Sequence, residues 1–216
     1  FNKSGLDKFN SLEKAKYSGK KWFSYLKGGS FRKWYGNKLN VVNWENNGEV
    51  LQSQRHPTED RVWATNFNLD YIFKPNINWG DVSSSELSAR ISKGGELFDS
   101  VGSACFPSKI NSHVIIGYLN SKVARSFLKI LNPTLHFLAG NIANLPIIEE
   151  LDNQKIIEII ELLVDISKED WDSSTNSWDF KSLPILSENQ KNLTIEKAYS
   201  ALRLRWHELT NEMKRL

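Results

Sequence analysis

Residues 20–36 read KKWFSYLKGGSFRKWYG and set the character of the front of the chain. Cationic side chains alternate here with large aromatic ones, and turn signals occur at 27–30 (KGGS) and 35–37 (YGN). Cations neutralise phosphates, while aromatic faces stack on bases or support the loop that presents the cations. Core packing would explain the aromatic residues equally well, so this pattern alone leaves nucleic-acid binding open.

Charge is distributed unevenly over the 216 residues, whose net charge is +3. Residues 1–40 hold ten Lys and Arg against two acidic residues, whereas residues 149–179 hold ten acidic residues against two Lys. This contrast predicts different surroundings for the two parts. We expect the acidic stretch to be a solvated surface, because runs of charge usually are.

Composition places the chain among globular proteins. Hydrophobic residues make up 40% and charged residues 25%, which excludes general disorder. Apolar runs such as 114–116 (VII) are too short to span a bilayer, and no secretory leader opens the sequence. The single cysteine, Cys105, excludes an internal disulfide framework and a cysteine-based zinc site. Because Phe1 comes first and the last helical pattern runs to residue 216, we expect truncation at both ends.

Short strands and turns are predicted for the front two thirds of the chain. Residues 39–44 read as a strand that the turn 46–48 closes, and the apolar run 113–118 reads as a buried strand. Residues 119–121 offer an N-cap to a helix that Asn132-Pro133 ends. The expected buried face of this helix consists of Val123, Phe127, Ile130 and Leu131.

Helical periodicity dominates the rear third, after an extended exit at 145–148 (LPII). Asp152 or Asn153 can cap a helix with Ile and Leu on one face, and a polar connector anchored by aromatic residues follows at 171–184. A last helix begins near Thr194. We expect the two helices to pack on each other along apolar seams, and the last seam comprises Ile195, Ala198, Leu202, Trp206, Leu209, Met213 and Leu216.

Catalytic motifs are missing from the sequence. The four histidines are scattered, no Gly-x-Gly-x-x-Gly or Walker-type loop occurs, and Cys105 has no activating neighbour, so a buried structural thiol is expected. Residues 132–135 (NPTL) are similar to the Asn-Pro-Pro-aromatic signature of amino-group methyltransferases. The third and fourth positions differ, and the aromatic residue that would stack on a flipped base is lacking. We therefore interpret 132–135 as a turn that ends a helix.

Residues 19–37 and 41–48 (VVNWENNG) together resemble the C-terminal part of the PglX family. These are the adenine-specific DNA methyltransferases of BREX bacteriophage-defence systems, and they are related to Eco57I-like restriction-modification methyltransferases. The likeness covers at least residues 19–180. Shorter matching stretches follow at 88–90, 95, 98–99, 119–122, 131–135, 141–142, 145–147, 170–173 and 177–180.

The resemblance implies an α+β fold, with a mixed target-recognition domain at 1–148 and a helical spacer or hairpin at 149–216. The layout is also similar to that of type I specificity subunits. The family's S-adenosylmethionine fold and Asn-Pro-Pro-aromatic motif lie upstream of the matching region. No cofactor is therefore expected in this chain, and S-adenosylmethionine is expected in a missing N-terminal domain. The chain would then be no enzyme by itself, whereas its full-length parent would be a site-specific adenine DNA methyltransferase.

The leading hypothesis is a sequence-specific double-stranded DNA recognition module that positions this methyltransferase domain in the bacterial cytoplasm. Arg can bind guanine and Asn can bind adenine through two hydrogen bonds. Trp34 and Tyr35 are expected to support their loop, and the rear helices are expected to stay off DNA. The predicted DNA contacts are Lys20, Lys21, Lys27, Arg32, Lys33, Asn43, Asn46, Arg55, Arg90 and Lys93.

A protein-interaction module is the alternative. Its basic face would dock an acidic partner, such as another BREX subunit or a phage DNA mimic, and no membrane partner is expected. Salt-dependent binding to duplex DNA would favour the first hypothesis, and a stable complex with a purified partner without DNA affinity would favour the second.

Overall fold

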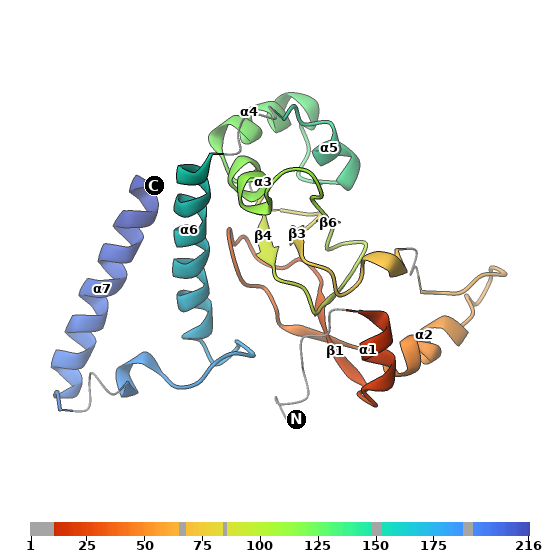
Figure 1. The fold of residues 1–216 in the computed structure, drawn as a ribbon, viewed down its shortest axis with the longest axis horizontal. Coiled ribbons are helices and arrows are strands. Elements are labelled where there is room, and N and C mark those ends of the chain that lie inside the picture. Colours follow the sequence, from red (N-terminus) through yellow and green to blue (C-terminus); the bar gives the residue numbers. More distant parts are fainter. Residues whose placement is uncertain (1–10, 65–67, 84–85, 148–152, 188–191) are drawn as a thin grey trace.

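The computed structural model describes residues 11–64, 68–83, 86–147, 153–187 and 192–216. Two three-stranded sheets lie at the centre, with α3, α4 and α5 above them (Figure 1). Helices α1 and α2 lie on one side, and α6 and α7 stand on the other (Figure 1). The mixture of helices and small sheets confirms the expected α+β class.

The first sheet forms around β1 (Trp22–Leu26). It pairs antiparallel with β2 (Asn40–Asn43) and parallel with β5 (Leu97–Phe98). Trp22 at the start of β1 is exposed, whereas Phe23 and Leu26 are each buried at 2% exposure. Because positions 23 and 26 point to opposite faces of a strand, β1 is covered on both faces. The strand predicted at 39–44 is confirmed as β2. The turn at 46–48 is confirmed as η2 (Glu45–Asn47), which ends at Gly48 in the left-handed conformation.

The second sheet has the order β4-β3-β6 and is antiparallel throughout. Its strands are β3 (Asn76–Asn78), β4 (Arg90–Ser92) and β6 (Ala104–Cys105). Trp34 joins the outer edge of β4, because its N–H donates to Ala89 O at 2.8 Å and its carbonyl accepts from Ile91 N at 2.9 Å. The loop between β1 and β2 is therefore built into the edge of this sheet.

The short helices around the sheets occupy both ends of the domain. At the first-sheet end lie α1 (Leu12–Tyr17), α2 (Glu49–Ser53) and the single turn η3 (Leu69–Tyr71). Helix α5 (Ala139–Ala143) lies at the opposite end, next to α4 (Figure 1).

The strand predicted at 113–118 is wrong, because this run forms helix α3 (Ser112–Leu119). A continuous apolar run fits a buried helix as well as a buried strand. Asn111 decides between them, since its side chain accepts a hydrogen bond from His113 N at 2.8 Å and caps the helix.

The helix predicted after residue 121 is confirmed as α4 (Lys122–Leu131), with Ser121 as its N-cap. Its predicted buried face is wrong. Ala124 and Leu128 are buried instead, at 0% and 3% exposure, whereas Val123, Phe127, Ile130 and Leu131 are exposed. The small side chain of Ala124 lets the helix approach the core closely, so the wide apolar face points to solvent.

Helix α6 (Gln154–Asp172) packs on α3 and completes the main core. Ile160 lies so close to Gly117 that a Cβ there would come within 2.8 Å of Ile160 Cδ1. Leu163 and Val164 share one apolar cluster with Ile77 and with residues of α3. Asn153 caps α6, while Asp152 and residue 148 of the expected exit lie outside the described residues. The core thus continues across the expected 148/149 boundary, and the division into two domains stays a prediction.

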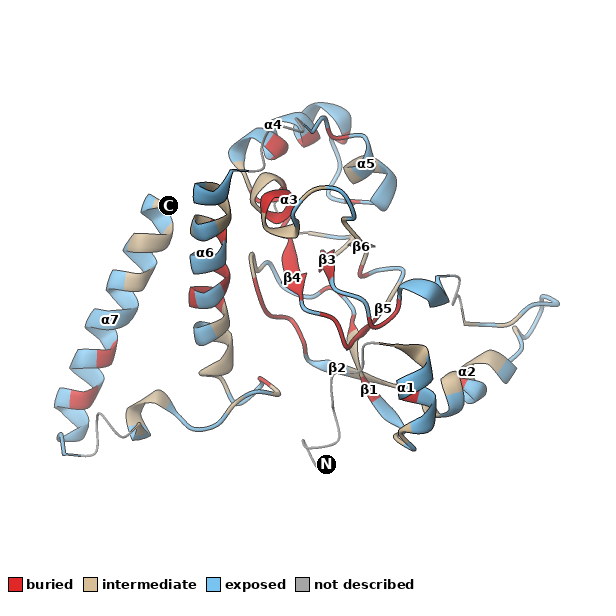
Figure 2. Ribbon diagram, in the orientation of Figure 1, coloured by how far each residue is buried: buried red, intermediate tan, exposed pale blue. Residues whose placement is uncertain are grey.

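Helix α7 (Ile195–Arg215) follows the turn η5 (Pro184–Leu186) and is exposed over most of its length (Figure 2). Ala198 and Leu202 of its predicted seam are buried, but Ile195 is 80% and Trp206 43% exposed. Over the described residues α7 packs mainly against η5, so the prediction that α6 and α7 pack closely along the whole seam is wrong. Near the end of the helix, Met213 packs against the main core. None of the described helices is both long and apolar enough to cross a membrane.

We predict that Leu128→Ala lowers the free energy of unfolding by about 2–5 kcal/mol, because it leaves a cavity in the main core. Ile130→Ala on the same helix should change it by less than about 0.5 kcal/mol, since that side chain is 80% exposed. Urea denaturation of the two variants measures both values. Equal losses would contradict the orientation of α4.

Candidate nucleic-acid interface

Arg32 joins the front of the chain to the end of α6. Its Nε donates to Tyr35 O at 2.8 Å, and its Nη2 donates to Ser167 O at 3.0 Å and to Asp170 Oδ2 at 2.6 Å. The guanidinium also lies 5.2 Å from the centre of the Trp171 ring. We name this set of contacts the Arg32 clamp. In this clamp the guanidinium of Arg32 binds other groups of the protein, through hydrogen bonds and through contact with an aromatic ring.

Arg90 is buried at 2% exposure beneath the same loop. It donates to Asn78 Oδ1 at 3.3 Å, to Arg32 O at 3.3 Å and to Ser88 O at 3.4 Å. Burial, together with the neighbouring Arg32 charge, lowers the pKa of Arg90 to about 10, which keeps it cationic at neutral pH. Lys33 Nζ donates to Asn120 O at 3.1 Å. The structure therefore gives these three cations intramolecular roles, and their contact with DNA stays a prediction.

Tyr35 is buried between two ammonium groups. Lys38 Nζ lies 4.8 Å and Lys168 Nζ 5.4 Å from the centre of its ring, and Lys38 also forms a buried ion pair with Glu96 at 2.7 Å. Burial raises the pKa of the Tyr35 phenol, and the carboxylates of Asp172, Asp179 and Glu96 raise it further. The expectation that Tyr35 supports its loop is confirmed, as it is for Trp34, which packs against the main core.

Four of the predicted contact residues come together at the open end of the β1–β2 pair. Asn43 faces Trp22 across the pair, and Trp44 N donates to Lys21 O at 2.9 Å, so Lys20 and Lys21 lie beside the turn that carries Asn46. Lys21 makes a weak ion pair with Glu45 at 3.9 Å, and half of its side chain is exposed.

The two asparagines of this cluster differ in their roles. Asn43 Oδ1 accepts from Glu45 N at 3.2 Å and so helps to start η2. Asn46 is exposed, adopts a positive φ of 51° and donates its amide to Glu49 Oε2 at 3.1 Å. Asn46 thus presents its amide at the surface, whereas Asn43 supports the turn.

Helix α1 packs beside η2 and adds cations that were not among the predicted contacts. Ser11 caps the helix and Ala15 is buried under it, which leaves Lys14 and Lys16 exposed. In the sequence, the spacing of Ser11, Ala15 and the flanking lysines indicates helix α1 itself, but not its position beside η2. Exposed aromatic rings accompany the cations, with Tyr17 at 77% and Trp22 at 43% exposure. We define the basic face as Lys14, Lys16, Tyr17, Lys20, Lys21 and Trp22.

The other predicted cations lie apart from the basic face and are exposed. Lys27 follows β1 and Lys93 follows β4. Arg55 lies in the loop 54–63, which extends away from the domain beyond α2 (Figure 1). Three backbone hydrogen bonds shape this loop. Trp63 N donates to Gln54 O and His56 N to Arg61 O, both at 2.9 Å, and Arg61 N donates to Glu59 O at 2.8 Å.

Cys105 and residues 132–135 have surroundings that suit structural roles. Burial raises the pKa of the Cys105 thiol to about 11, as suits a structural cysteine. Asn132 donates to His136 O at 2.6 Å and accepts from Thr134 at 2.8 Å, which confirms that 132–135 is a turn. Within the described ranges, no group of three or more His, Cys, Asp and Glu side chains is placed to hold a metal ion.

Two curated proteins are similar to this chain. Adenine-specific methyltransferase PglX of Lacticaseibacillus casei (strain Zhang) is 39% identical over 202 residues, which is 90% of this chain and 16% of the relative. Adenine-specific methyltransferase BrxX of Escherichia coli O9:H4 (strain HS) is 31% identical over 180 residues, 82% of this chain and 14% of the relative. No protein-family model matches. The chain therefore spans about a sixth of the length of these relatives. It is homologous to one segment of each of them.

We predict that Arg32→Ala lowers the free energy of unfolding by about 2–3 kcal/mol, because charge-assisted hydrogen bonds to Ser167 and Asp170 are removed. Arg32→Lys keeps the charge but cannot reach all three acceptors, so it should recover less than half of this stability. Urea denaturation measures both variants against the exposed control Lys27→Ala. Full recovery by lysine would contradict the clamp.

We predict that Cys105 reacts with iodoacetamide at pH 8 at least tenfold more slowly than a cysteine peptide. A thiol with a pKa of about 11 is almost entirely protonated at that pH, and only the thiolate is the nucleophile. The rate should rise as the pH approaches 11 or when urea unfolds the chain. Mass spectrometry of the alkylated protein follows the reaction, and a peptide-like rate in the folded protein would disprove the burial of this thiol.

Proposed function

We propose that this chain, a homologue of one segment of the adenine-specific methyltransferases PglX and BrxX, is the double-stranded DNA recognition module of a BREX-type methyltransferase. In this role it selects the sequence at which a longer protein methylates adenine in host DNA, which marks that DNA for phage defence in the bacterial cytoplasm. The observation that carries the proposal is the basic face, where four lysines lie near the start of β1. This face belongs to a chain that is homologous to adenine-specific methyltransferases.

The basic face suits a phosphate backbone. Its four lysines come from α1 and from the chain entering β1, two neighbouring elements, so their charges add over a small area. Lysine ammonium groups act as mobile point charges that follow a backbone without reading sequence. The exposed rings of Tyr17 and Trp22 lie among them, with Lys16 Nζ 5.8 Å from the Tyr17 ring and Lys21 Nζ 5.9 Å from the Trp22 ring. These rings can pack on sugars or on splayed bases.

Sequence would be read by exposed groups outside the basic face, at the turn next to it and on the loop 54–63 farther away. Asn46 presents an amide that can bind adenine, and Arg55 presents a guanidinium that can bind guanine through two hydrogen bonds. The loop 54–63 extends from the domain, which suits insertion into a groove, and Trp63 in it is 56% exposed. Arg32, Lys33 and Arg90 would then support the reading surface rather than touch DNA.

The acidic helix is placed where it would not oppose this binding. Glu158, Glu161 and Asp165 are exposed on α6, whereas α1 and α2 lie on the other side of the sheets (Figure 1). Like charges repel, so duplex DNA would approach from the side of α1.

Methyl transfer is assigned to another part of the longer protein. S-adenosylmethionine sites need an open backbone cradle, and the glycine pairs of this chain are closed by their own surroundings. A Cβ at Gly29 would lie 2.9 Å from Asn37 Nδ2, and one at Gly94 would lie 2.7 Å from Phe73 O. The glycine pairs therefore give no support for a cofactor cradle, and we derive no catalytic step from them.

We predict that Lys14→Ala with Lys16→Ala, and separately Lys20→Ala with Lys21→Ala, weaken binding to duplex DNA. The slope of log K against log salt should fall by about one unit for each phosphate that a variant no longer neutralises. Fluorescence anisotropy with a labelled mixed-sequence duplex over a salt series measures this slope. Lys109→Ala with Lys181→Ala removes the same charge from exposed positions away from the basic face and is the control.

Unchanged affinity and slope in both basic-face variants, with normal thermal stability, would reject the proposed interface. An equal weakening in the control would show that only net charge matters. If wild-type protein binds no duplex but binds a purified acidic partner, the alternative of a protein-interaction module takes its place. Methylation sequencing of a host that carries the longer protein, with and without Arg55→Ala, tests whether the loop 54–63 sets the target.

A further inference from the structure

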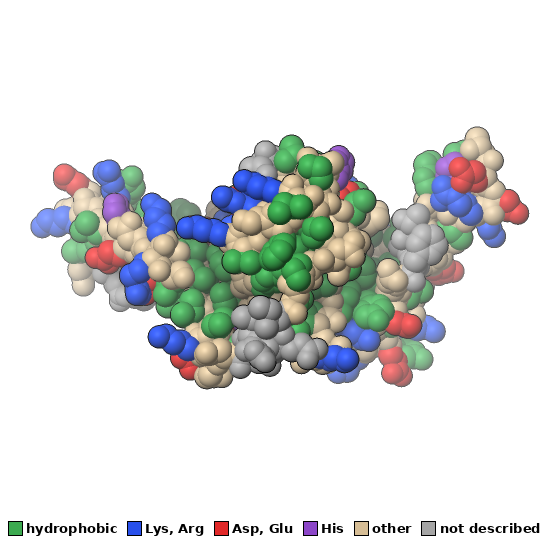
Figure 3. All heavy atoms as spheres, turned by 90° about the horizontal axis from the view of Figure 1, so that it is seen from above, with side chains coloured by type: hydrophobic (Ala, Val, Ile, Leu, Met, Phe, Trp, Pro, Cys, Tyr) green, Lys and Arg blue, Asp and Glu red, His purple; other side chains and the backbone are tan. Residues whose placement is uncertain are grey.

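Helix α4 exposes three kinds of surface side by side. At 100° per residue, Lys122, Arg125 and Lys129 form one row along the helix. Val123, Phe127 and Ile130 form a second row on one flank of the cations, with exposures of 57%, 39% and 80%. Seen from above the domain, hydrophobic side chains gather at the surface and cationic side chains project beside them (Figure 3).

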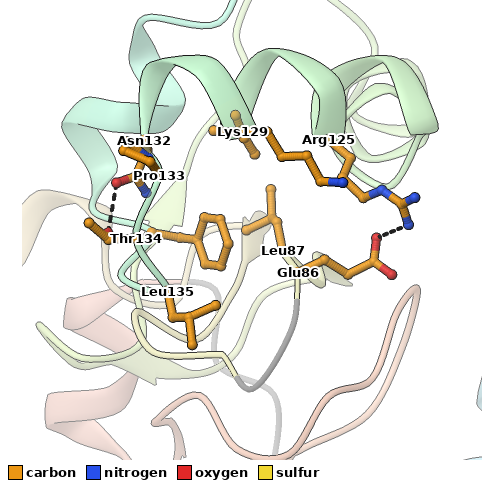
Figure 4. A pocket seen from close by; sticks show the side chains of 10 residues that line it. Glu86, Leu87, Arg125, Lys129, Asn132, Pro133, Thr134 and Leu135 are labelled. Carbon is orange, nitrogen blue, oxygen red and sulfur yellow. Dashed lines mark hydrogen bonds and ion pairs between the residues drawn. The ribbon is translucent and has the colours of Figure 1, made fainter.

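A cleft of about 500 Å³ lies on the other flank of the cation row. Its apolar walls come from Leu87, Leu128 and Phe137, and Leu135 stands at its edge with 49% exposure. Arg125 and Lys129 overhang the cleft from α4, opposite Glu86 (Figure 4). An apolar side chain of a partner would fit this space while its neighbours meet the cations.

The cations of this row retain charge for a partner. Arg125 is paired with Glu86 at 3.0 Å. Among the described residues, no side chain forms an ion pair or hydrogen bond with the ammonium group of Lys122 or Lys129. Within the part of the chain that the structure describes, two positive charges without an ion-pair partner thus lie between two apolar surfaces.

We propose that α4 and the adjoining cleft form a docking site for an acidic protein segment. The segment would carry carboxylates that meet Lys122 and Lys129, with apolar side chains on both sides of them, one group covering Val123, Phe127 and Ile130 and the other entering the cleft. The positive charges of the row require a negatively charged partner. The two apolar surfaces require that this partner also carries apolar side chains, as a protein segment does. This site is separate from the basic face and does not depend on the proposed DNA binding.

Protein fits this surface better than nucleic acid does. Phosphates would pair with the cations, but the sugars of a duplex backbone offer only small apolar faces between charged groups, too little to cover Phe127 and Ile130. A contiguous exposed apolar patch beside charged residues is typical of protein interaction sites. Amphipathic helices are a common occupant of such surfaces, because one helix face can supply the apolar side chains and its edge the carboxylates.

Two synthetic helical peptides test the site on the intact chain. Both carry two rows of Leu with one charged row between them, and they differ only in having Glu or Lys in that row, which would meet α4. The protein variants are Lys122→Glu with Lys129→Glu, which reverses the row, and Phe127→Ser with Ile130→Ser, which removes the apolar row. All four side chains are exposed, so these variants should fold, and thermal unfolding verifies this.

The Glu peptide should bind the wild-type protein saturably, and each double variant should weaken it at least tenfold. The Lys peptide should bind the charge-reversed variant at least tenfold more tightly than it binds wild type. Failure of the Glu peptide to bind, or failure of charge reversal to switch the preference, would overturn the proposal. Duplex binding is measured in parallel: a lower salt slope for the charge-reversed variant, equal to that of the basic-face variants, would assign the row to DNA and also overturn it.

Discussion

The Arg32 clamp is the interaction on which the arrangement of this chain depends. One guanidinium binds its own loop at Tyr35 and the end of α6 at Ser167 and Asp170. Gly36 makes this possible, because it adopts a φ of 123° and a Cβ there would lie 2.5 Å from Arg32 Nε and 2.8 Å from Trp171. The loop is also part of the edge of β4. The clamp therefore fixes the position of α6 relative to both sheets.

The sequence predicted the elements whose signals are local and left open what tertiary packing decides. Strand β2, the turn at 46–48 and the caps at Ser121 and Asn153 follow from short patterns, and the family resemblance implied the α+β class. The run 113–118 became a helix because Asn111 caps it, and the apolar period alone could not exclude a strand. For α4 the helix was predicted correctly, but the predicted buried face was wrong. The side with the small residue Ala124 packs closely on the core, and the side with the larger apolar residues is exposed.

The prediction of site residues shows the same difference between local patterns and tertiary packing. Composition identified a cationic, aromatic front segment, but only the fold distinguishes Arg32, Lys33 and Arg90, which turn inward, from Lys20 and Lys21, which remain at the surface. Lys14 and Lys16 join them because α1 packs beside η2, a contact that no local pattern specifies. Arginine density in a sequence is thus a weak guide to DNA contact, because guanidinium groups also satisfy many buried carbonyls.

The loop 54–63 has backbone hydrogen bonds that side-chain replacement leaves intact, alongside local side-chain contacts such as that of Arg61 with Glu59. Its position beyond α2 also keeps it away from the main core. Mutations in it therefore carry little cost to folding, in contrast to changes at the Arg32 clamp. Under the proposed function, this separates the part that can diversify from the part that must persist. Substitutions in one loop would then change the proposed target site while the scaffold stays constant.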